Sequence, residues 1–532
     1  MKFRILSCPT LLNLGAAFLV LSVLLNLDYP ADPIFTRLLV LPSLDVWMLL
    51  LPLAMAARCG KRFVFWATLL TWMLFLILRL VRIGDTVVPM FLDRPFNLYI
   101  DSGYLFGLYD LLKTTSGQEG LPGLAVGATA VLLGFCLISW HAWRLAAKAL
   151  SSNRIRFAFL GGSALILAAG LLWGWQPAKP SALVRLGQEI RSIHEQTERQ
   201  KAFVARLEGT AKEREALPAT LHGLGGADVF LFIIESYGQV VFSQPRYRQA
   251  MEATMTRFGT TLAQHGFEAV SSSLLSPTYG GSSWLAHGTL ESGVRVGNDL
   301  EDAALLRSGV QPMAALFRRN GYRSVSVMPG TRFAFPQGSY FDYDQAYYAW
   351  HFNYQGRPFG WAPMPDQFVL DWVRRHEVEK RTQPLFIRYA LISSHAAFNI
   401  QPPLIADWET IGDGSLYQER EPVTFPVTWP DLKNAGPAYL RSLEYEFAVL
   451  GDYLARYVDA DALIIILGDH QPNLQLTGPG ESWSVPVHII SRNPRLLQPF
   501  RQRGYTPGLI PAQPQPHAGM ETFLPGFLKD FQ

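Results

Sequence analysis

Charge and cysteine are both scarce in this chain. Charged residues make up 17% of the 532 residues, whereas soluble domains carry about 25%. Hydrophobic residues reach 49%, and this composition excludes a disordered chain, a coiled coil and a small disulfide-linked scaffold. A wholly soluble protein is also disfavoured, because the missing charge should be concentrated in one part of the chain. The net charge of +3 is too small to indicate a nucleic-acid partner.

The three cysteines are Cys8, Cys59 and Cys136. All of them lie near the N-terminus, so the remainder of the chain cannot form an internal disulfide, whatever its compartment. The sequence also lacks a P-loop and the glycine fingerprint of a Rossmann fold, so no motif indicates a nucleotide cofactor.

The shortage of charge comes from residues 1–175, which contain five apolar runs. Each run is long enough, or nearly long enough, to cross about 30 Å of hydrocarbon. The runs cover residues 11–27, 37–57, 63–83, 124–143 and 157–175. We predict a membrane domain of five helical spans. A cleaved signal peptide is the alternative for the first run, but the stretch Asp28–Asp32 after it offers no small-residue cleavage site.

The segments on one side of this predicted membrane domain carry most of its basic residues. They precede the first run and separate the second from the third and the fourth from the fifth: Lys2, Arg4, Arg58, Lys61, Arg62, Arg144, Lys148, Arg154 and Arg156. The positive-inside rule makes this face cytoplasmic, so everything after the fifth run should be extracytoplasmic. Asp45 falls inside the second run, and an acid there is a functional candidate unless it lies near the outer interface.

Two connecting segments are distinctive. The loop of residues 84–122 is aromatic and amphipathic, and we expect it at the outer interface, either as a platform for a lipid substrate or as a simple connector. Residues 176–226 predict a linker, with a proline-rich start at 176–180 and an amphipathic helix over 183–214.

From residue 227 to 532 strand and helix patterns alternate, which predicts one α/β domain with a mostly parallel sheet. Strand-like runs cover residues 228–234, 268–273, 323–328, 385–392, 462–468 and 485–491. Helical patterns cover residues 246–265, 283–292, 303–319, 366–380 and 436–457. Ligands bind at the carboxyl ends of the strands in such sheets, so chemistry is expected in the residues that follow each strand.

Three potential metal ligands follow two of these strands. Glu235 comes directly after the first strand, and Asp469 and His470 follow the fifth. A helix cap or a buried ion pair would explain any one of them alone. Their positions at two strand ends of one sheet favour a shared cation, and mixed oxygen and nitrogen ligands suit zinc or manganese better than magnesium.

A glycine turn and two serines open the helix at 283–292. Gly280 and Gly281 allow a tight turn, and Ser282 and Ser283 follow it. A serine at a helix N-terminus is placed where backbone N–H groups favour a phosphate or an alkoxide, although a plain N-cap is the alternative. A bound cation would lower the pKa of the serine hydroxyl and prepare it to attack phosphorus.

Two histidines are further candidates. His395 follows the fourth strand and is placed to bind a phosphate or to protonate a leaving oxygen, with a structural role as the alternative. His287 lies one helical turn beyond Ser283 and could face the same site. His488 lies inside a strand pattern, which indicates a structural residue.

Five apolar runs, an amphipathic linker and the motifs Gly-Gly-Ser-Ser, Ser-Ser-His and Gly-Asp-His together resemble one known group. The chain is similar to the lipoteichoic acid synthases and phosphoglycerol transferases of the alkaline phosphatase/sulfatase superfamily. The resemblance covers the whole chain in architecture and about residues 228–492 in motifs. It implies a sulfatase-like catalytic domain on the periplasmic side of the bacterial inner membrane.

The resemblance also assigns roles. It implies one divalent cation held by Glu235, the nucleophile, Asp469 and His470. Ser282 matches the nucleophile best when counted from the glycine turn, with Ser283 as the alternative. His395 matches a substrate-contacting histidine.

Other residues near the predicted site match the family pattern less well. Arg332 is the nearest candidate for the arginine that holds the phosphate, although the sequence around it departs from the family pattern. The stretch 356–372 is similar to relatives that are only known as sulfatase-like, and its Trp361 and Asp366 would shape the pocket.

The implied function is metal-dependent transfer of a phospholipid headgroup, of the phosphoglycerol type, to a glycan or lipid acceptor through a phospho-serine intermediate. Phosphoethanolamine transferases are the nearest rival, but their catalytic domains typically carry disulfides and this one has no cysteine. A phosphodiesterase or phosphatase that uses water as acceptor is a second alternative, and a non-enzymatic sensor that retains the fold is a third. A true sulfatase would need a formylglycine motif, which the Ser-Ser-Trp-Leu-Ala-His segment lacks.

Overall fold

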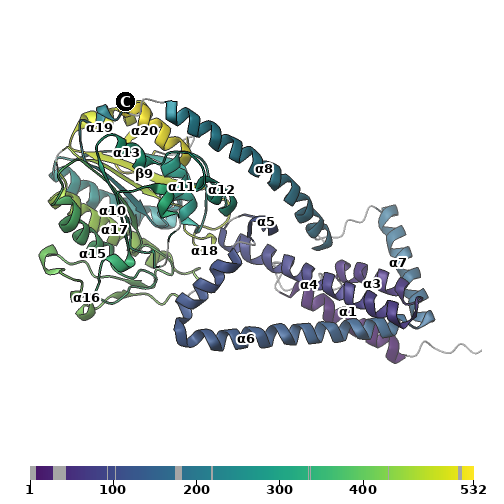
Figure 1. Cartoon of the computed structure of the whole chain (residues 1–532). Helices are drawn as coiled ribbons and strands as arrows, with labels where there is room; N and C mark the ends of the chain where they lie inside the picture. The colour runs from purple at the N-terminus through teal and green to yellow at the C-terminus, as the bar shows by residue number, and fades with distance from the viewer. Residues whose placement is uncertain are drawn as a thin grey trace, which may run out of the picture. The chain divides into compact units, whose positions relative to one another are not determined.

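The computed structural model describes residues 8–27, 43–92, 94–101, 104–173, 182–216, 220–332, 335, 337–428, 431–459, 461–512 and 518–532. The chain forms two compact units, one of residues 1–89 and 94–199 and the other of residues 90–93 and 200–532 (Figure 1). Lys2, Arg4, residues 37–42 of the second predicted span and the proline-rich segment 176–180 lie outside the described residues.

The N-terminal unit is helical. Its helices are α1 (Cys8–Asn26), α3 (Leu44–Ala56), α4 (Gly60–Leu92), α5 (Leu98–Asp101), α6 (Tyr104–Leu150) and α7 (Asn153–Trp173). The long helix α8 (Ala182–Ala216) covers the helix predicted over 183–214 and continues into the second unit. The predicted loop 84–122 is largely helical instead, because α4 extends to Leu92 and α6 begins at Tyr104.

Within the described residues, three stretches of helix are long and apolar enough to cross a membrane: Pro9–Asn26, Gly60–Pro89 and Ala125–Leu150. Helix α3 is apolar but has only 13 residues, and α7, which covers most of the fifth predicted run, does not join this set. The prediction of five spans is therefore not confirmed, whereas an apolar helical N-terminal region is.

Asp45 has a structural role in this unit. It lies in the first turn of α3 and is 2% exposed. Its two carboxylate oxygens accept hydrogen bonds from the backbone N–H groups of Ala182 and Leu183, at 2.9 and 3.1 Å, and it lies 3.5 Å from the Arg82 guanidinium. Because the first N–H groups of a helix have no partner within the helix, Asp45 caps the start of α8.

The second unit is built on a nine-stranded sheet in the order β10-β2-β9-β8-β1-β5-β3-β4, with β11 beside β2. The strands are β1 (Val229–Ile234), β2 (Glu268–Leu275), β3 (Arg323–Met328), β4 (Gln345–Tyr348), β5 (Leu385–Leu391), β8 (Leu463–Gly468), β9 (Ser484–Ser491), β10 (Thr506–Pro507) and β11 (Ala518–Gly519). Strands β8, β1, β5, β3 and β4 run parallel, and β9 is antiparallel to both of its neighbours. A separate hairpin joins β6 (Ile400–Gln401) and β7 (Val423–Thr424).

Both faces of the sheet are covered, which explains the nearly continuous apolar strands. In β1, Phe230, Phe232 and Ile234 belong to one core, whereas Val229, Leu231 and Ile233 belong to the other. The first core contains side chains of α10 (Pro245–Gln264), α15 (Asp366–Val373) and α17 (Gly436–Tyr457). The second contains side chains of α11 (Ser283–Ser292), α13 (Met313–Arg319), α19 (Pro494–Gln502) and α20 (Phe523–Phe531). Figure 1 shows the two sets of helices on opposite sides of the strands.

Shorter helices complete this unit: α9 (Val240–Ser243), α12 (Asp299–Leu305), α14 (Gly338–Phe341), α16 (Leu416–Glu419) and α18 (Leu474–Thr477). The helix predicted over 303–319 is two helices, α12 and α13, with Pro312 as the N-cap of the second. The α/β prediction is confirmed, and the sheet is mixed rather than wholly parallel.

Candidate metal and nucleophile site

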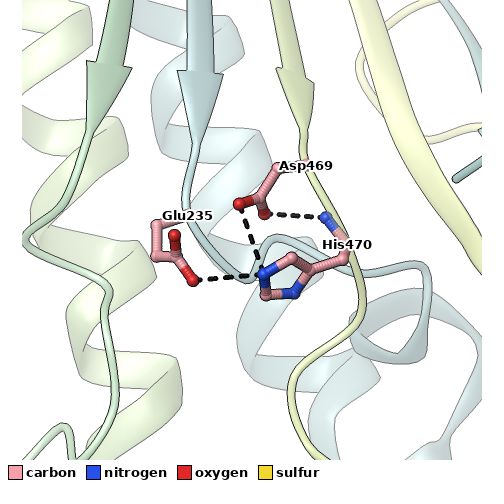
Figure 2. Close-up of side chains that lie close together, drawn as sticks. All are labelled: Glu235, Asp469 and His470. Atoms are coloured by element: carbon pink, nitrogen blue, oxygen red, sulfur yellow. Dashed lines mark hydrogen bonds and ion pairs between the residues drawn. The ribbon is translucent and has the colours of Figure 1, made fainter. Parts of the chain in front are cut away.

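The three predicted metal ligands meet at one edge of the sheet. Strands β1 and β8 are parallel neighbours with Ile234 opposite Gly468, so Glu235 and Asp469 leave the sheet side by side. One ligand atom from each of Glu235, Asp469 and His470 lies within 4.8 Å of the others (Figure 2). The His470 Nε2 atom is 3.4 Å from a carboxylate oxygen of each of the two acids.

Backbone groups orient these side chains. The Asp469 Oδ1 atom accepts hydrogen bonds from the N–H groups of Ser236 and His470, at 2.8 and 2.7 Å, while Oδ2 lies towards the imidazole. Ser236 adopts a left-handed conformation with φ of 58°, and its hydroxyl donates to Glu235 Oε1 at 2.9 Å. The Nδ1 atom of His470 lies 2.7 Å from the carbonyl oxygen of Gln471, which assigns the proton to Nδ1 and leaves Nε2 as a ligand atom.

The carboxylates of Asp469, which is buried, and Glu235, which is half-buried, are close enough to repel each other. Burial, followed by the charge of Glu235, raises the pKa of Asp469 to about 7. Burial alone would lower the pKa of His470, but Asp469 and Glu235 raise it overall. A divalent cation would neutralise this negative charge, and the two carboxylates, one imidazole and a nearby hydroxyl form a donor set that fits such an ion.

The Ser283 hydroxyl reaches the cluster. It is the first residue of α11. Its Oγ donates to Glu235 Oε2 at 3.0 Å and lies 3.2 Å from His470 Nε2. Ser282, the serine favoured by counting from the glycine turn, is the N-cap of α11 in a left-handed conformation with φ of 61°. Both serines line the cavity beside the cluster.

A cavity of about 320 Å³ opens beside the cluster. Its lining includes the sequence-predicted residues Glu235, Ser282, Ser283, His287, Trp361, His395 and Asp469. Much of the remaining wall is apolar or aromatic, with Trp284, Met328, Phe335 and Phe398. The site therefore has one strongly polar end, at the cluster, and a mainly apolar remainder.

His395 and Arg332 both contact Trp361. The imidazole of His395 stacks on the indole with the ring centres 4.1 Å apart, and its Nδ1 lies 2.6 Å from the carbonyl oxygen of Ala396. The Arg332 guanidinium lies 5.7 Å from the centre of the Trp361 ring and donates to the Trp361 carbonyl oxygen. Burial lowers the pKa of His395 to about 4, so the ring is neutral at pH 7. Burial also lowers the pKa of Arg332.

Residues 283–510 match the model of the sulfatase family. The chain contains a sulfatase-family domain. The predicted membership of the alkaline phosphatase/sulfatase superfamily is thereby confirmed, as is the prediction that the chain is an enzyme of this superfamily. The matched residues include Ser283, His395, Asp469 and His470, whereas Glu235 precedes them and joins the site through β1.

Solved structures similar to the chain include three from bacteria. The lipoteichoic acid synthase LtaP from Listeria monocytogenes is 15% identical over 57% of this chain and 76% of its own, with a TM-score of 0.38. The phosphoglycerol transferase GacH from Streptococcus pyogenes, in complex with sn-glycerol-1-phosphate, is 11% identical over 63% and 91%, with a TM-score of 0.34. The C-terminal periplasmic domain of EptC from Escherichia coli, in complex with zinc, is 13% identical over 51% and 74%, with a TM-score of 0.33. No curated protein matches the chain.

A buried ion pair between α11 and β5 was not predicted from the sequence. His287, Glu291 and Ser283 are spaced by four residues on α11, and Glu291 Oε1 lies 3.1 Å from the Arg388 Nε on β5. Both charged side chains are at most 1% exposed, and Tyr343 donates to Glu291 at 2.5 Å. Burial, followed by the charges of Arg388 and His470, lowers the pKa of His287 well below its usual value. One signal was available, because an arginine interrupts the otherwise apolar strand 385–391.

Proposed function

We propose that the chain transfers a phospholipid headgroup to a glycan or lipid acceptor, with Ser283 as the nucleophile. The observation that carries this proposal is the position of the Ser283 Oγ, within 3.2 Å of both Glu235 and His470 at the start of α11. The sulfatase-family match supports the reaction class, and the apolar helices of the N-terminal region support action at a membrane.

Glu235, Asp469, His470 and Ser283 are the residues that would hold one divalent cation. When bound, this cation lowers the pKa of the serine hydroxyl and neutralises charge on the phosphoryl oxygens. Manganese and zinc fit the mixed oxygen and nitrogen donors better than magnesium. Ser283 is the first residue of α11, and the start of a helix favours an anion.

The transfer has two steps. In the first, the bond from Ser283 Oγ to phosphorus forms, the bond from phosphorus to diacylglycerol oxygen breaks, and the serine proton ends on that oxygen. In the second, the acceptor oxygen binds phosphorus, the Oγ–phosphorus bond breaks, and the acceptor proton returns to Oγ. We assign the proton transfers to His395, because it is neutral and its Nδ1 is already bonded to a carbonyl, which leaves Nε2 to exchange a proton.

The cavity favours a headgroup without positive charge. Among the described residues that line it, Glu235 and Asp469 are the only carboxylates, and both belong to the cation site. The Arg332 guanidinium lies 5.7 Å from the centre of the Trp361 ring, and its positive charge attracts a phosphate and repels an ammonium group. A phosphoglycerol headgroup therefore fits this cavity better than phosphoethanolamine, in agreement with the absence of cysteine after residue 136.

The test uses the full-length protein in lipid nanodiscs with manganese or zinc. Fluorescent phosphatidylglycerol and phosphatidylethanolamine are supplied in parallel, and diacylglycerol release is measured. Ser283→Ala should lower release by more than about 1,000-fold, as expected when a nucleophile is removed. Ser282→Ala is the matched control and should retain most activity. Mass spectrometry of trapped protein should find a glycerophosphate adduct on Ser283.

Three outcomes would contradict parts of this proposal. An adduct on Ser282, or full activity of Ser283→Ala, would refute the nucleophile. Preference for phosphatidylethanolamine would refute the headgroup. Release that is equally fast without any glycan or lipid acceptor, with free glycerophosphate as the product, would show a phosphodiesterase instead.

A further inference from the structure

His287 lies on the face of α11 that carries Ser283 and Glu291. Contacts at both ends define this face. The Ser283 Oγ donates to Glu235 at 3.0 Å. The Glu291 carboxylate lies 3.1 Å from the Arg388 Nε. Residues spaced by four lie on the same side of a helix, so His287 faces the same way, one helical turn of about 5.4 Å from Ser283. His287 also lines the cavity beside the cluster. It is therefore close to the phosphorus that the Ser283 hydroxyl would attack, although the proposed transfer steps give it no role.

The imidazole of His287 has no hydrogen-bond partner in the described part of the chain. The residue is 7% exposed, and none of the hydrogen bonds between described residues involves its ring. Because buried polar groups are nearly always hydrogen-bonded, an unpaired imidazole in a cavity wall indicates a partner on the ligand. Burial, followed by the charges of Arg388 and His470, lowers the pKa of His287, so the ring is neutral at pH 7. A neutral ring offers one N–H donor and one acceptor nitrogen.

In the described structure, the cavity wall outside the cluster carries no charged side chain. Among the described residues that line the cavity there is no lysine or arginine, and its two carboxylates, Glu235 and Asp469, belong to the cluster. Neutral hydrogen-bonding side chains are present instead, among them Thr331 and Asn473. Asn473 is 7% exposed, and its Oδ1 is buried without a hydrogen-bond partner among the described residues. A charged part of a ligand would meet no opposite charge here, whereas a hydroxyl group would meet neutral donors and acceptors.

We propose that His287 recognises a hydroxyl group of the transferred headgroup and makes the enzyme selective for a hydroxylated headgroup such as glycerol. This role rests on the proposed function and adds the chemical group that is recognised. A hydroxyl can accept from the ring N–H or donate to the other ring nitrogen, so it pairs with whichever nitrogen faces the cavity. An ammonium group can only donate, and the positive charge of Arg388 acts on the same ring. An ionised phosphate can only accept, and the cluster is the site that would hold it.

The test measures headgroup transfer by the full-length protein in lipid nanodiscs with manganese. Two donor lipids are compared. One is phosphatidylglycerol, and the other is phosphatidylpropanol, whose headgroup has the same carbons and phosphate but neither hydroxyl. The wild type should prefer phosphatidylglycerol by at least about 10-fold in kcat/KM, because the analogue leaves a buried polar group of the site unpaired. In His287→Leu, which has a similar size and no hydrogen-bonding group, this preference should fall below about 3-fold.

Two further variants serve as controls. His287→Gln keeps a donor and an acceptor in the side chain and should retain a preference of more than about 5-fold for phosphatidylglycerol. His265→Leu replaces an exposed histidine and should keep the wild-type preference. Because the preference is a ratio measured within one sample, it does not depend on how much of a variant is folded, which matters for a residue as buried as His287.

A binding measurement tests the same role without turnover. In isothermal titration calorimetry of the full-length protein with manganese, glycerol phosphate should bind at least about 10-fold more tightly than propyl phosphate, and His287→Leu should remove most of this difference. If the wild type releases no diacylglycerol from either lipid, the proposed function fails, and the binding comparison still decides the role of His287. Equal losses for both donor lipids in His287→Leu would show that the imidazole acts on the phosphate or on Ser283, and would refute hydroxyl recognition. A wild type that binds glycerol phosphate and propyl phosphate equally well would refute it too.

Discussion

His488 gives a stability prediction that can be worked out from its contacts. It is fully buried on β9, between the Tyr237 hydroxyl at 2.9 Å from Nε2 and the Ser271 hydroxyl at 2.7 Å from Nδ1. Ser271 donates its own proton to the carbonyl oxygen of Gly508 at 2.6 Å, so it accepts from Nδ1–H, and Nε2 accepts from Tyr237. Burial lowers the pKa of His488 to about 3, because a second ring proton would be desolvated and would face a donor.

The sign of the pH effect follows from this lowered pKa. The unfolded chain takes up a proton on His488 as the pH falls through about 6.5, whereas the folded protein does so only near pH 3. The stabilising contribution of neutral His488 is complete above about pH 6.5 and is lost progressively towards pH 3. Between pH 7 and pH 5 the loss amounts to about 2 kcal/mol.

The assay is urea-dependent pulse proteolysis of the full-length protein in detergent with a chelator present, following the C-terminal unit. His488→Gln should be less stable than the wild type at pH 7 by about 1–3 kcal/mol, since buried partners lose a hydrogen bond. This difference should shrink by about 2 kcal/mol at pH 5. His265→Gln, at an exposed histidine, is the control and should show no such change. A constant difference between wild type and His488→Gln at the two pH values would refute a buried neutral imidazole.

Two further predictions concern stability. Glu291→Gln leaves the Arg388 charge buried without its carboxylate and should destabilise the C-terminal unit by about 3–5 kcal/mol, whereas replacing both residues with leucine or methionine should recover most of the loss; the same proteolysis assay measures both. Asp45→Ala removes the acceptor of two backbone N–H groups at the start of α8 and should cost the N-terminal unit about 1–2 kcal/mol, seen as faster protease cleavage in the first turns of that helix.

Sequence reasoning worked best where the physical rule was strong. Ligands gather at the carboxyl ends of parallel strands, and this rule alone placed Glu235 beside Asp469 and His470. It worked less well where local backbone geometry decides the outcome. Counting from the glycine turn favours Ser282, which has a left-handed conformation, whereas the Ser283 Oγ donates to Glu235. The sequence pattern does not determine the φ angle of a serine that follows two glycines.

The membrane region shows a second kind of limit. Hydropathy identifies apolar runs but not the helix boundaries within them. The mixed aromatic and polar residues of 84–122 gave no indication that α6 begins at Tyr104. The direction of β9 was also undetermined, because a strand buried on both faces has the same pattern in either direction. Asp366 lies 26 residues before Ile392, and only the folded chain shows that its carboxylate accepts from the N–H group of that residue.

The nucleophile and the buried ion pair belong to one helix face. Residues spaced by four lie on the same side of a helix, so the face of α11 that presents Ser283 to the cluster also presents Glu291 to Arg388. An apolar pair would be at least as stable in such a position, but it would allow the helix to rotate or slide on the sheet. A directional ion pair, with Tyr343 as a further donor, permits one rotation of α11. We infer that this buried pair helps to fix where the Ser283 hydroxyl points.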